Sequence, residues 1–176
     1  SEPRDPGGPS SAAAEQLNDR YVESPPSIEN AVDLFAGEWS TKLPVDTPTG
    51  FADLIGDHRI TSCVDALGGV DGARVLELGP LEGAHTATLR TLGAASVVAI
   101  EANTGAFQRC LVTKEILGLD GVEFRPVARW IERDDLLTVI DQLGFDVLLR
   151  DDHDHPHGPA ITLALRRRPE GRQEHR

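Results

Sequence analysis

Two glycines that closely follow an acid have the type and spacing of a ligand-binding turn. They lie in the segment VLELGPLEGAHT, which begins at Val75 and contains Glu77, Gly79 and Gly83. Glycine has no Cβ, so a ligand can approach the backbone of such a turn closely. A helix that starts after the turn would add free N–H groups and the positive end of its dipole. The segment therefore predicts a small-molecule site where a strand ends.

The residues inside the turn favour a cationic ligand over a pyrophosphate. Dinucleotide-binding turns follow G-x-G-x-x-G, in which the middle glycine leaves room for the pyrophosphate. Here Leu81 takes that place, and Glu82 adds a negative charge. Another acid, Glu101, ends the apolar run SVVAIE, 24 residues after Glu77.

The pattern E-x-G-x-x-x-G, followed by an acid at the end of the next strand, resembles the cofactor motifs of class I S-adenosylmethionine-dependent methyltransferases. The resemblance implies S-adenosylmethionine as the cofactor, with Glu101 on the ribose and with Ala102 and Asn103 beside the adenine. Glu77 and Glu82 would supply negative potential near the sulfonium and the α-amino group. A generic α/β turn with two packing glycines is the alternative. The cofactor-binding residues that the resemblance implies are Glu77, Gly79, Pro80, Leu81, Glu82, Gly83, His85, Glu101, Ala102 and Asn103.

A finer resemblance concerns one branch of that family. Residues 93–119 are most similar to the tRNA wobble-uridine carboxymethyltransferases and their relatives. The segment GEWSTKLP, with Trp39 and Lys42, is similar to the N-terminal extension of that branch, which implies a substrate-binding or lid role for these two residues. Trp39 could equally be an apolar anchor for the N-terminal helix.

Alternating strands and helices must position these residues. From residue 73 the chain reads as strand, helix, strand, helix and strand, and continuous apolar strands predict a parallel sheet buried by helices on both faces. A helix and two closely spaced strands follow, and the short connection between these strands predicts an antiparallel hairpin. The expected strands span residues 73–79, 96–102, 122–127, 145–151 and 160–167, and the expected helices span residues 27–39, 51–69, 84–94, 104–119 and 135–144.

Four segments divide the chain. Residues 1–26 are rich in Pro, Gly, Ser and Ala and are predicted to be disordered. Residues 27–69 form a helical N-terminal extension, and residues 70–166 form the methyltransferase-like α/β domain. Residues 167–176 form a basic tail.

The resemblance also implies that the α/β domain is incomplete. A class I domain has seven strands, and the fourth and fifth are absent where Arg129 follows Ala128. We therefore predict an α/β, Rossmann-like class I methyltransferase sheet: parallel strands flanked by helices, a C-terminal antiparallel hairpin, and no counterpart of the usual fourth and fifth strands. Three explanations stay open. The sequence at hand omits a segment, the protein is a natural or engineered remnant, or a partner chain completes the sheet.

A histidine-rich segment, DDHDHPHG, occupies residues 151–158. His153, His155 and His157 alternate with other residues, and His and Asp are good ligands for divalent ions. A proline and a glycine in the segment favour a solvated hairpin turn instead, so no metal site is predicted. The strand before this segment is expected to run parallel to the first strand, which would place the segment on the cofactor side of the sheet. A histidine there could alternatively act as a general base. His153 and His155 are therefore the catalytic candidates.

Charge and composition limit the partners. The net charge is −12, which would repel a polyanion and disfavours nucleic acid. No apolar run approaches the roughly 18 residues of a membrane span. Cys63 and Cys110 make no CxxC pair, and we expect buried free thiols in a reducing cytoplasm. We expect a cytoplasmic protein with a small-molecule substrate and no membrane partner, and a homo-oligomer is left open.

Taken together, these features predict an enzyme, an S-adenosylmethionine-dependent methyltransferase that acts on a small-molecule or metabolite acceptor. Methyl transfer depends largely on alignment and desolvation, so no fixed catalytic triad is expected. A non-catalytic remnant or binding module is one alternative. A tRNA-modifying methyltransferase is another, which the acidic composition disfavours.

Overall fold

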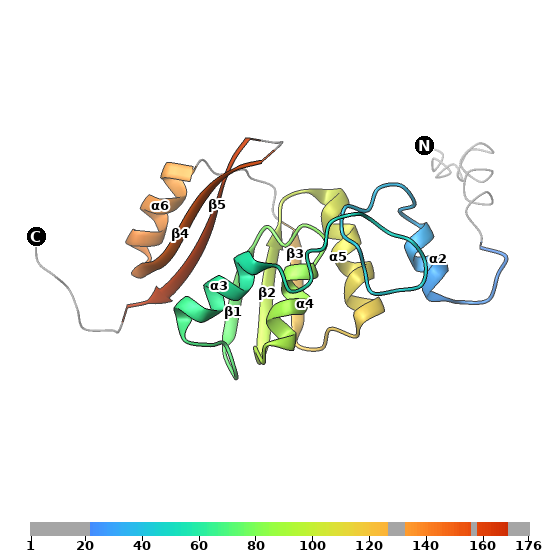
Figure 1. The fold of residues 1–176 in the computed structure, drawn as a ribbon, viewed down its shortest axis with the longest axis horizontal. Helices are drawn as coiled ribbons and strands as arrows, with labels where there is room; N and C mark the ends of the chain where they lie inside the picture. Colours follow the sequence, from blue (N-terminus) through green and yellow to red (C-terminus); the bar gives the residue numbers. More distant parts are fainter. Residues whose placement is uncertain (1–21, 127–132, 156–157, 169–176) are drawn as a thin grey trace, which may run out of the picture.

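The computed structural model describes residues 22–126, 133–155 and 158–168 (Figure 1). The predicted disordered segment up to residue 21, the junction between Ala128 and Arg129, and the basic tail beyond residue 168 lie outside these residues. In chain order the elements are α2 (Ile28–Asp33), α3 (His58–Leu67), β1 (Arg74–Leu78), α4 (Ala84–Thr91), β2 (Ser96–Glu101), α5 (Thr104–Leu117), β3 (Val122–Pro126), α6 (Arg133–Gln142), β4 (Phe145–His155) and β5 (Gly158–Arg167).

Strands β1, β2 and β3 form a parallel sheet in that order. Leu76 lies beside Val98, and Ala99 lies beside Phe124. Because the strands are parallel, their carboxyl ends meet at one edge, where the glycine turn follows β1 and Glu101 ends β2. The parallel strands, their helices and the antiparallel pair β4–β5 confirm the predicted α/β, Rossmann-like fold class.

The core lies on one face of this sheet. Val97 and Ala99 of β2 are fully buried, and Val64, Ala87 and Cys110 from α3, α4 and α5 belong to the same apolar cluster. Figure 1 shows α3 and α4 in front of the strands, with α5 to one side of them. Right-handed crossovers from β1 to β2 and from β2 to β3 advance in one direction, so they place α4 and α5 on the same face.

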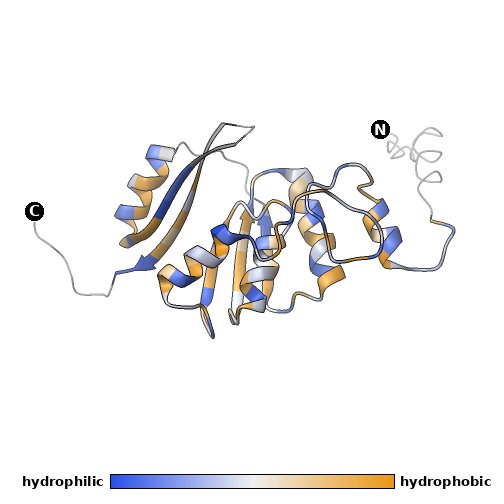
Figure 2. Cartoon of the chain, viewed as in Figure 1, coloured by the Kyte–Doolittle hydropathy of each residue, from blue (hydrophilic) through white to orange (hydrophobic). Residues whose placement is uncertain are grey.

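The opposite face of β1 is open to solvent. Leu76 and Leu78 are 62% and 55% exposed, although β1 and β2 are mostly hydrophobic (Figure 2). The prediction that the strands are buried on both faces is therefore wrong at β1, and also at β3, where Glu123 and Arg125 are exposed. An apolar run in the sequence indicates only that a strand is favoured in a buried position. The helices or strands that would bury it must come from other parts of the chain. Only residues 127–132 separate β3 from α6, too few for the two strands and helix that complete class I sheets.

Strands β4 and β5 form the predicted antiparallel hairpin, but as a separate sheet. The hairpin packs against α3, where Arg166 donates a hydrogen bond of 2.8 Å to the Leu67 carbonyl. Helix α6 packs against β4. The expectation that β4 runs parallel to β1 in one sheet is not met, because among the described residues no strand pairs with both the hairpin and β1.

The histidine-rich segment is mostly strand, not turn. His153 pairs with Ala160, and His155 pairs with Gly158. The prediction of a turn over residues 151–158 is therefore wrong at both ends. Proline and glycine indicate that the chain reverses direction, but they do not determine how many residues the turn contains. Backbone hydrogen bonds between the two strands extend both strands toward the turn as far as residues can pair.

The N-terminal extension contains less helix than predicted. Helix α2 starts at Ile28, after the N-cap Ser27, whose hydroxyl accepts a hydrogen bond from Asn30 N, but it ends at Asp33. Helix α3 starts at His58, after an N-cap at Asp57. Gly68 ends α3 with a φ of 79°, as its sequence pattern predicts.

Both cysteines are free and buried, as predicted. Within the described residues no helix has the length and apolar character needed to cross a bilayer.

Candidate functional site

The turn between β1 and α4 holds a strained backbone. Leu81 has a φ of 55°, the only positive φ at a non-glycine among the described residues. Such a conformation is costly and persists only where neighbouring contacts enforce it. Here the Leu81 N–H donates to Glu101 at 2.9 Å, and the Cys110 thiol donates to the Leu81 carbonyl at 3.2 Å. The end of β2 and helix α5 thus fix the shape of the turn.

The two glycines of the turn serve different purposes. Gly79 has a φ of 72°, and a Cβ built there would meet no atom within 4 Å. Gly83 has a φ of 83°, and a Cβ there would lie 3.1 Å from Cζ of Phe124. Gly83 is therefore a packing glycine beneath α4, whereas Gly79 leaves open space at the carboxyl edge of the sheet.

Two carboxylates lie at the ends of adjacent strands. Glu101 is 7% exposed and also accepts a hydrogen bond of 2.7 Å from Asn103 N. Glu77 accepts one of 2.5 Å from the hydroxyl of Thr86. Burial raises the pKa of Glu77 to about 7, and the negative charge of Glu101 adds to this effect. The pair provides negative potential that an arriving cation would relieve.

Glu82 joins three segments of the chain. Its fully buried carboxylate accepts hydrogen bonds from Ser40 N and Thr41 N, the latter at 2.7 Å, and from Arg109 Nε at 2.8 Å. Glu82 therefore fastens the N-terminal extension and α5 to the glycine turn. From the sequence, Glu82 was predicted to supply negative potential near the cofactor. Its hydrogen bonds to Ser40, Thr41 and Arg109 were not predicted.

Trp39 and Lys42 differ in their surroundings. Trp39 is 7% exposed, donates from Nε1 to the Val32 carbonyl at 2.9 Å, and packs edge-on against Phe35. These contacts are those of the apolar anchor that was the alternative to a lid role. The Lys42 side chain is 65% exposed, with its amine 3.6 Å from Asp53.

The remaining cofactor candidates flank the turn. Ala102 and Asn103 are exposed directly after β2, and the Asn103 side chain caps α5 by accepting a hydrogen bond from Ala106 N. Pro80 is fully buried.

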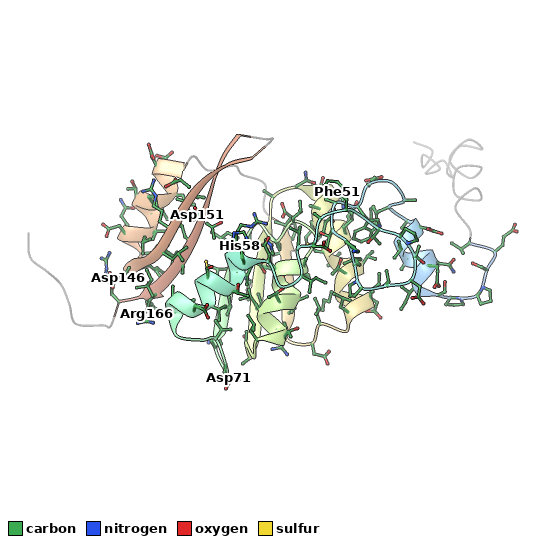
Figure 3. The ribbon with its side chains drawn as sticks, in the orientation of Figure 1. Phe51, His58, Asp71, Asp146, Asp151 and Arg166 are labelled. Atoms are coloured by element: carbon green, nitrogen blue, oxygen red, sulfur yellow. The ribbon has the colours of Figure 1, made fainter. Side chains whose placement is uncertain are left out.

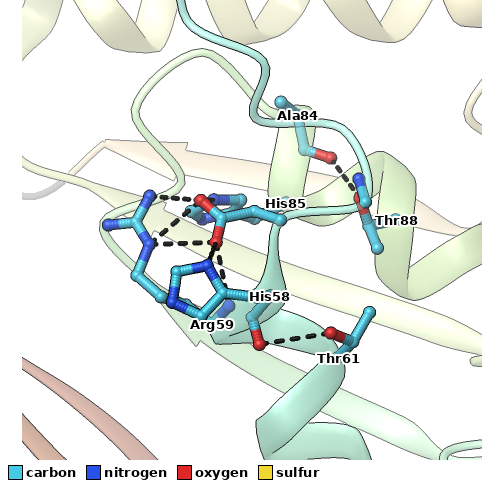
Figure 4. Close-up of polar contacts among 8 residues, drawn as sticks. His58, Arg59, Thr61, Ala84, His85 and Thr88 are labelled. Atoms are coloured by element: carbon cyan, nitrogen blue, oxygen red, sulfur yellow. Dashed lines mark hydrogen bonds and ion pairs between the residues drawn. The ribbon is translucent and has the colours of Figure 1, made fainter.

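His85 belongs to a polar cluster that the sequence did not indicate (Figure 4). Its Nε2 lies 3.3 Å from Oδ2 of Asp57, and the same carboxylate accepts hydrogen bonds from Arg59. His58 Nδ1 lies 3.4 Å from Oδ1. The contact between Asp57 and His85 gives no sequence signal, because the two residues are 28 positions apart in the chain.

The predicted catalytic candidates His153 and His155 lie in β4, and His157 lies outside the described residues. The side chains of His153 and His155 are also outside what the structure describes. In the part of the chain that is described, no group of three or more His, Cys, Asp or Glu side chains is arranged to hold a metal ion.

Comparisons with known proteins show the fold. No family model and no curated protein sequence matches the chain. The N-terminal domain of EvdMO1, crystallised in the presence of SAH and D-fucose, is similar with a TM-score of 0.53 at 14% identity, over 80% of this chain and 95% of that one. The structure of EvdMO1 itself is similar with a TM-score of 0.51 at 16% identity, over 78% of this chain and 46% of that one.

The N-terminal domain of EvdMO1 with SAH bound gives a TM-score of 0.46 at 23% identity, over 57% of this chain and 44% of that one. The chain thus spans less than half the length of two of these three structures. At such identities the likeness to the two structures with TM-scores above 0.5 establishes a shared fold.

Proposed function

We propose that the glycine turn binds S-adenosylmethionine and that the chain is a methyltransferase for a small-molecule acceptor. The observation that carries this proposal is the joint placement of Glu77 and Glu101 beside the fixed turn at Leu81. S-adenosylmethionine presents a sulfonium and an ammonium group, and both are stabilised by carboxylates. A pyrophosphate would instead meet two acids and the side chain of Leu81.

The residues present suit this cofactor. Gly79 leaves space at the turn, and Glu101 has a carboxylate at the strand end where ribose-binding acids stand in nucleotide folds. Ala102 and Asn103 are exposed beside it, as residues that border an adenine would be. Glu77, with its pKa near neutrality, would ionise fully when a cation arrives. The N-terminal domain of EvdMO1, whose fold this chain shares, was crystallised in the presence of SAH, which supports the assignment.

When bound, the cofactor would supply an electrophilic methyl group on a cationic sulfur. The chain would then contribute alignment, a water-poor site and negative potential, which are the main sources of rate in such a displacement. Glu82 would act indirectly by holding the turn against the N-terminal extension, and Trp39 by anchoring that extension.

The open face of β1 favours a second candidate. With Leu76 and Leu78 exposed, the sheet lacks the side on which class I enzymes build much of their acceptor pocket. A non-catalytic module that binds the cofactor would have this structure. A tRNA acceptor, and with it the wobble-uridine branch, suits the chain poorly because of its net charge of −12. Two buried free thiols are compatible with a cytoplasmic location.

Calorimetric titration with S-adenosylhomocysteine tests the proposal. We expect saturable binding that excess NADH does not displace. Binding of NADH together with no response to S-adenosylhomocysteine would refute it. Methyl transfer from S-adenosylmethionine to any acceptor in a panel of hydroxyl-bearing metabolites would then separate the enzyme from the binding module.

A further inference from the structure

Asp57 joins the first turns of α3 and α4. Its carboxylate caps α3 by accepting a hydrogen bond of 2.8 Å from Arg59 N, and it accepts another of 3.0 Å from Arg59 Nε. Oδ2 lies 3.3 Å from Nε2 of His85 (Figure 4). The Asp57 side chain is only 8% exposed. The hydrogen bonds from Arg59 hold the pKa of Asp57 well below its usual range, so this carboxyl is ionised at neutral pH.

An ionised carboxylate can only accept hydrogen bonds, so it selects one form of the histidine ring. The proton of a neutral His85 must lie on Nε2, which faces Asp57, and Nδ1 keeps its lone pair. Burial lowers the pKa of His85, so the ring is neutral near pH 7. Among the described residues none donates a hydrogen bond to Nδ1. His85 thus has an unprotonated nitrogen ready to accept a proton.

The charged groups around His85 come from two helices and one strand. Asp57, His58 and Arg59 belong to the start of α3, and His85 is the second residue of α4. The pKa of Arg59 is raised by its hydrogen bond to Asp57 and, less strongly, by the charge of Asp151 on β4. Figure 3 shows His58 at the upper end of α3, with Asp151 on the hairpin beside it. The cluster therefore lies between the carboxyl edge of the parallel sheet and the hairpin.

His85 stands next to the site proposed for the cofactor. It follows Gly83, the N-cap of α4, by two residues, and its neighbour Thr86 donates a hydrogen bond to Glu77. The His85 side chain is 17% exposed, whereas that of His58 is 88% exposed. His85 is therefore partly shielded from bulk water, as a proton acceptor in a reaction site should be, and His58 is not.

We propose that His85 accepts the proton of a hydroxyl-bearing methyl acceptor and that Asp57 positions its ring. The inference rests on the proposed function. As the acceptor oxygen forms its bond to the methyl carbon, the carbon–sulfur bond breaks with its electron pair on sulfur. The hydroxyl proton passes to Nδ1 of His85, which becomes an imidazolium beside the Asp57 carboxylate and later returns the proton to water. The substrate class that follows is an alcohol or phenol, whose oxygen must lose a proton on methylation.

Two measurements on the full chain test this inference. Nitrogen-15 NMR of the imidazole rings at pH 7.5 should find His85 neutral, with the proton on Nε2. Modification by diethyl pyrocarbonate, which acylates unprotonated imidazole nitrogens, should be slowed severalfold at His85 by saturating S-adenosylhomocysteine. His58 is the internal control, because its exposed ring should react equally with and without the ligand.

Variants then separate positioning from folding. Asp57→Asn should mix the two ring tautomers of His85 and lower its pKa further, because the ring loses its hydrogen bond to a charged acceptor and Arg59 loses its counter-charge. His58→Asn should leave the His85 signals unchanged. If Asp57→Asn does not fold, the two measurements on the unaltered chain still decide the question.

Each outcome has one meaning. A proton on Nδ1, or an imidazolium at pH 7.5, would overturn the inference. If calorimetry shows that S-adenosylhomocysteine binds while the reactivity of His85 does not change, the proposed function stands and the role of His85 is refuted. If the ligand does not bind, the proposed function fails and the inference falls with it.

Discussion

The carboxylate of Glu101 accepts a hydrogen bond of 2.9 Å from the backbone N–H of Leu81, which joins the end of β2 to the turn after β1. The same residue thus shapes the glycine turn and has the position from which an acid would bind a ribose. Because Leu81 has a φ of 55°, the turn depends on this contact to hold its shape.

Glu101→Ala should therefore weaken binding of S-adenosylhomocysteine by about 1.5–3 kcal/mol, the scale of hydrogen bonds to a charged group. Calorimetry measures the loss. Glu123→Ala is the matched control, because Glu123 lies on β3 with a side chain that is 59% exposed and pairs only with Arg125 among the described residues. Equal affinity in the wild type and in Glu101→Ala would remove Glu101 from the site.

Gly79→Val should abolish binding by filling the open space at the turn. The change also adds backbone strain, since φ is 72° at this residue. Gly37→Val separates the two effects, because Gly37 has a φ of 79° and no atom near its Cβ position, and it lies after α2. Both variants should lose similar stability in denaturant titrations. Only Gly79→Val should lose the ligand, and retention of binding there would show that the turn is not the site.

Glu82→Ala should destabilise the protein by about 3–5 kcal/mol, the cost of removing one partner of a buried ion pair. Arg109, whose side chain is 11% exposed, would lose its buried carboxylate, and Ser40 N and Thr41 N would lose their acceptor. Urea titration gives the free energy of unfolding, and amide exchange should rise at Ser40 and Thr41.

Glu38 provides the control for that change. Glu38 also pairs with Arg109, at 3.2 Å, but its side chain is 63% exposed. Glu38→Ala should therefore cost less than about 1 kcal/mol. A similar loss in both variants would contradict the fastening role of Glu82.

Glu77 should make stability depend on pH. Its folded pKa of about 7 lies above its usual value of 4.5, so between these values the folded protein binds more protons than the unfolded chain. Stability should therefore fall as pH rises from 4.5 to 7, by about 3 kcal/mol from this group. In Glu77→Gln this part of the slope should disappear. An unchanged slope in that variant would show that Glu77 is not the titrating group.

The local elements of the fold could be predicted because their signals are local. Apolar runs marked β1, β2 and β3, and Gly68 marked the end of α3. The cover of β1 could not be predicted, because burial of Leu76 and Leu78 depends on segments distant in sequence. The histidine-rich strand was missed for the same reason, since its ladder partner Ala160 decides its conformation.

Some residues of the candidate site could also be predicted from the sequence, whereas others could not. Gly79, Gly83 and Glu101 followed from spacing along two strands, and the structure brings them to one edge. Asp57 and Arg109 gave no signal, because their partners His85 and Glu82 are far away in sequence. Tertiary contacts of this kind carry no periodicity that a sequence could reveal.

A crystal of the chain soaked with S-adenosylhomocysteine would show whether the glycine turn binds the cofactor. We expect the ribose hydroxyls to lie within hydrogen-bond distance of the Glu101 carboxylate, with the sulfur over the turn at Gly79 and near Glu77. A ligand seated away from the carboxyl edge of β1 and β2, or a turn that stays empty at saturating ligand, would contradict it.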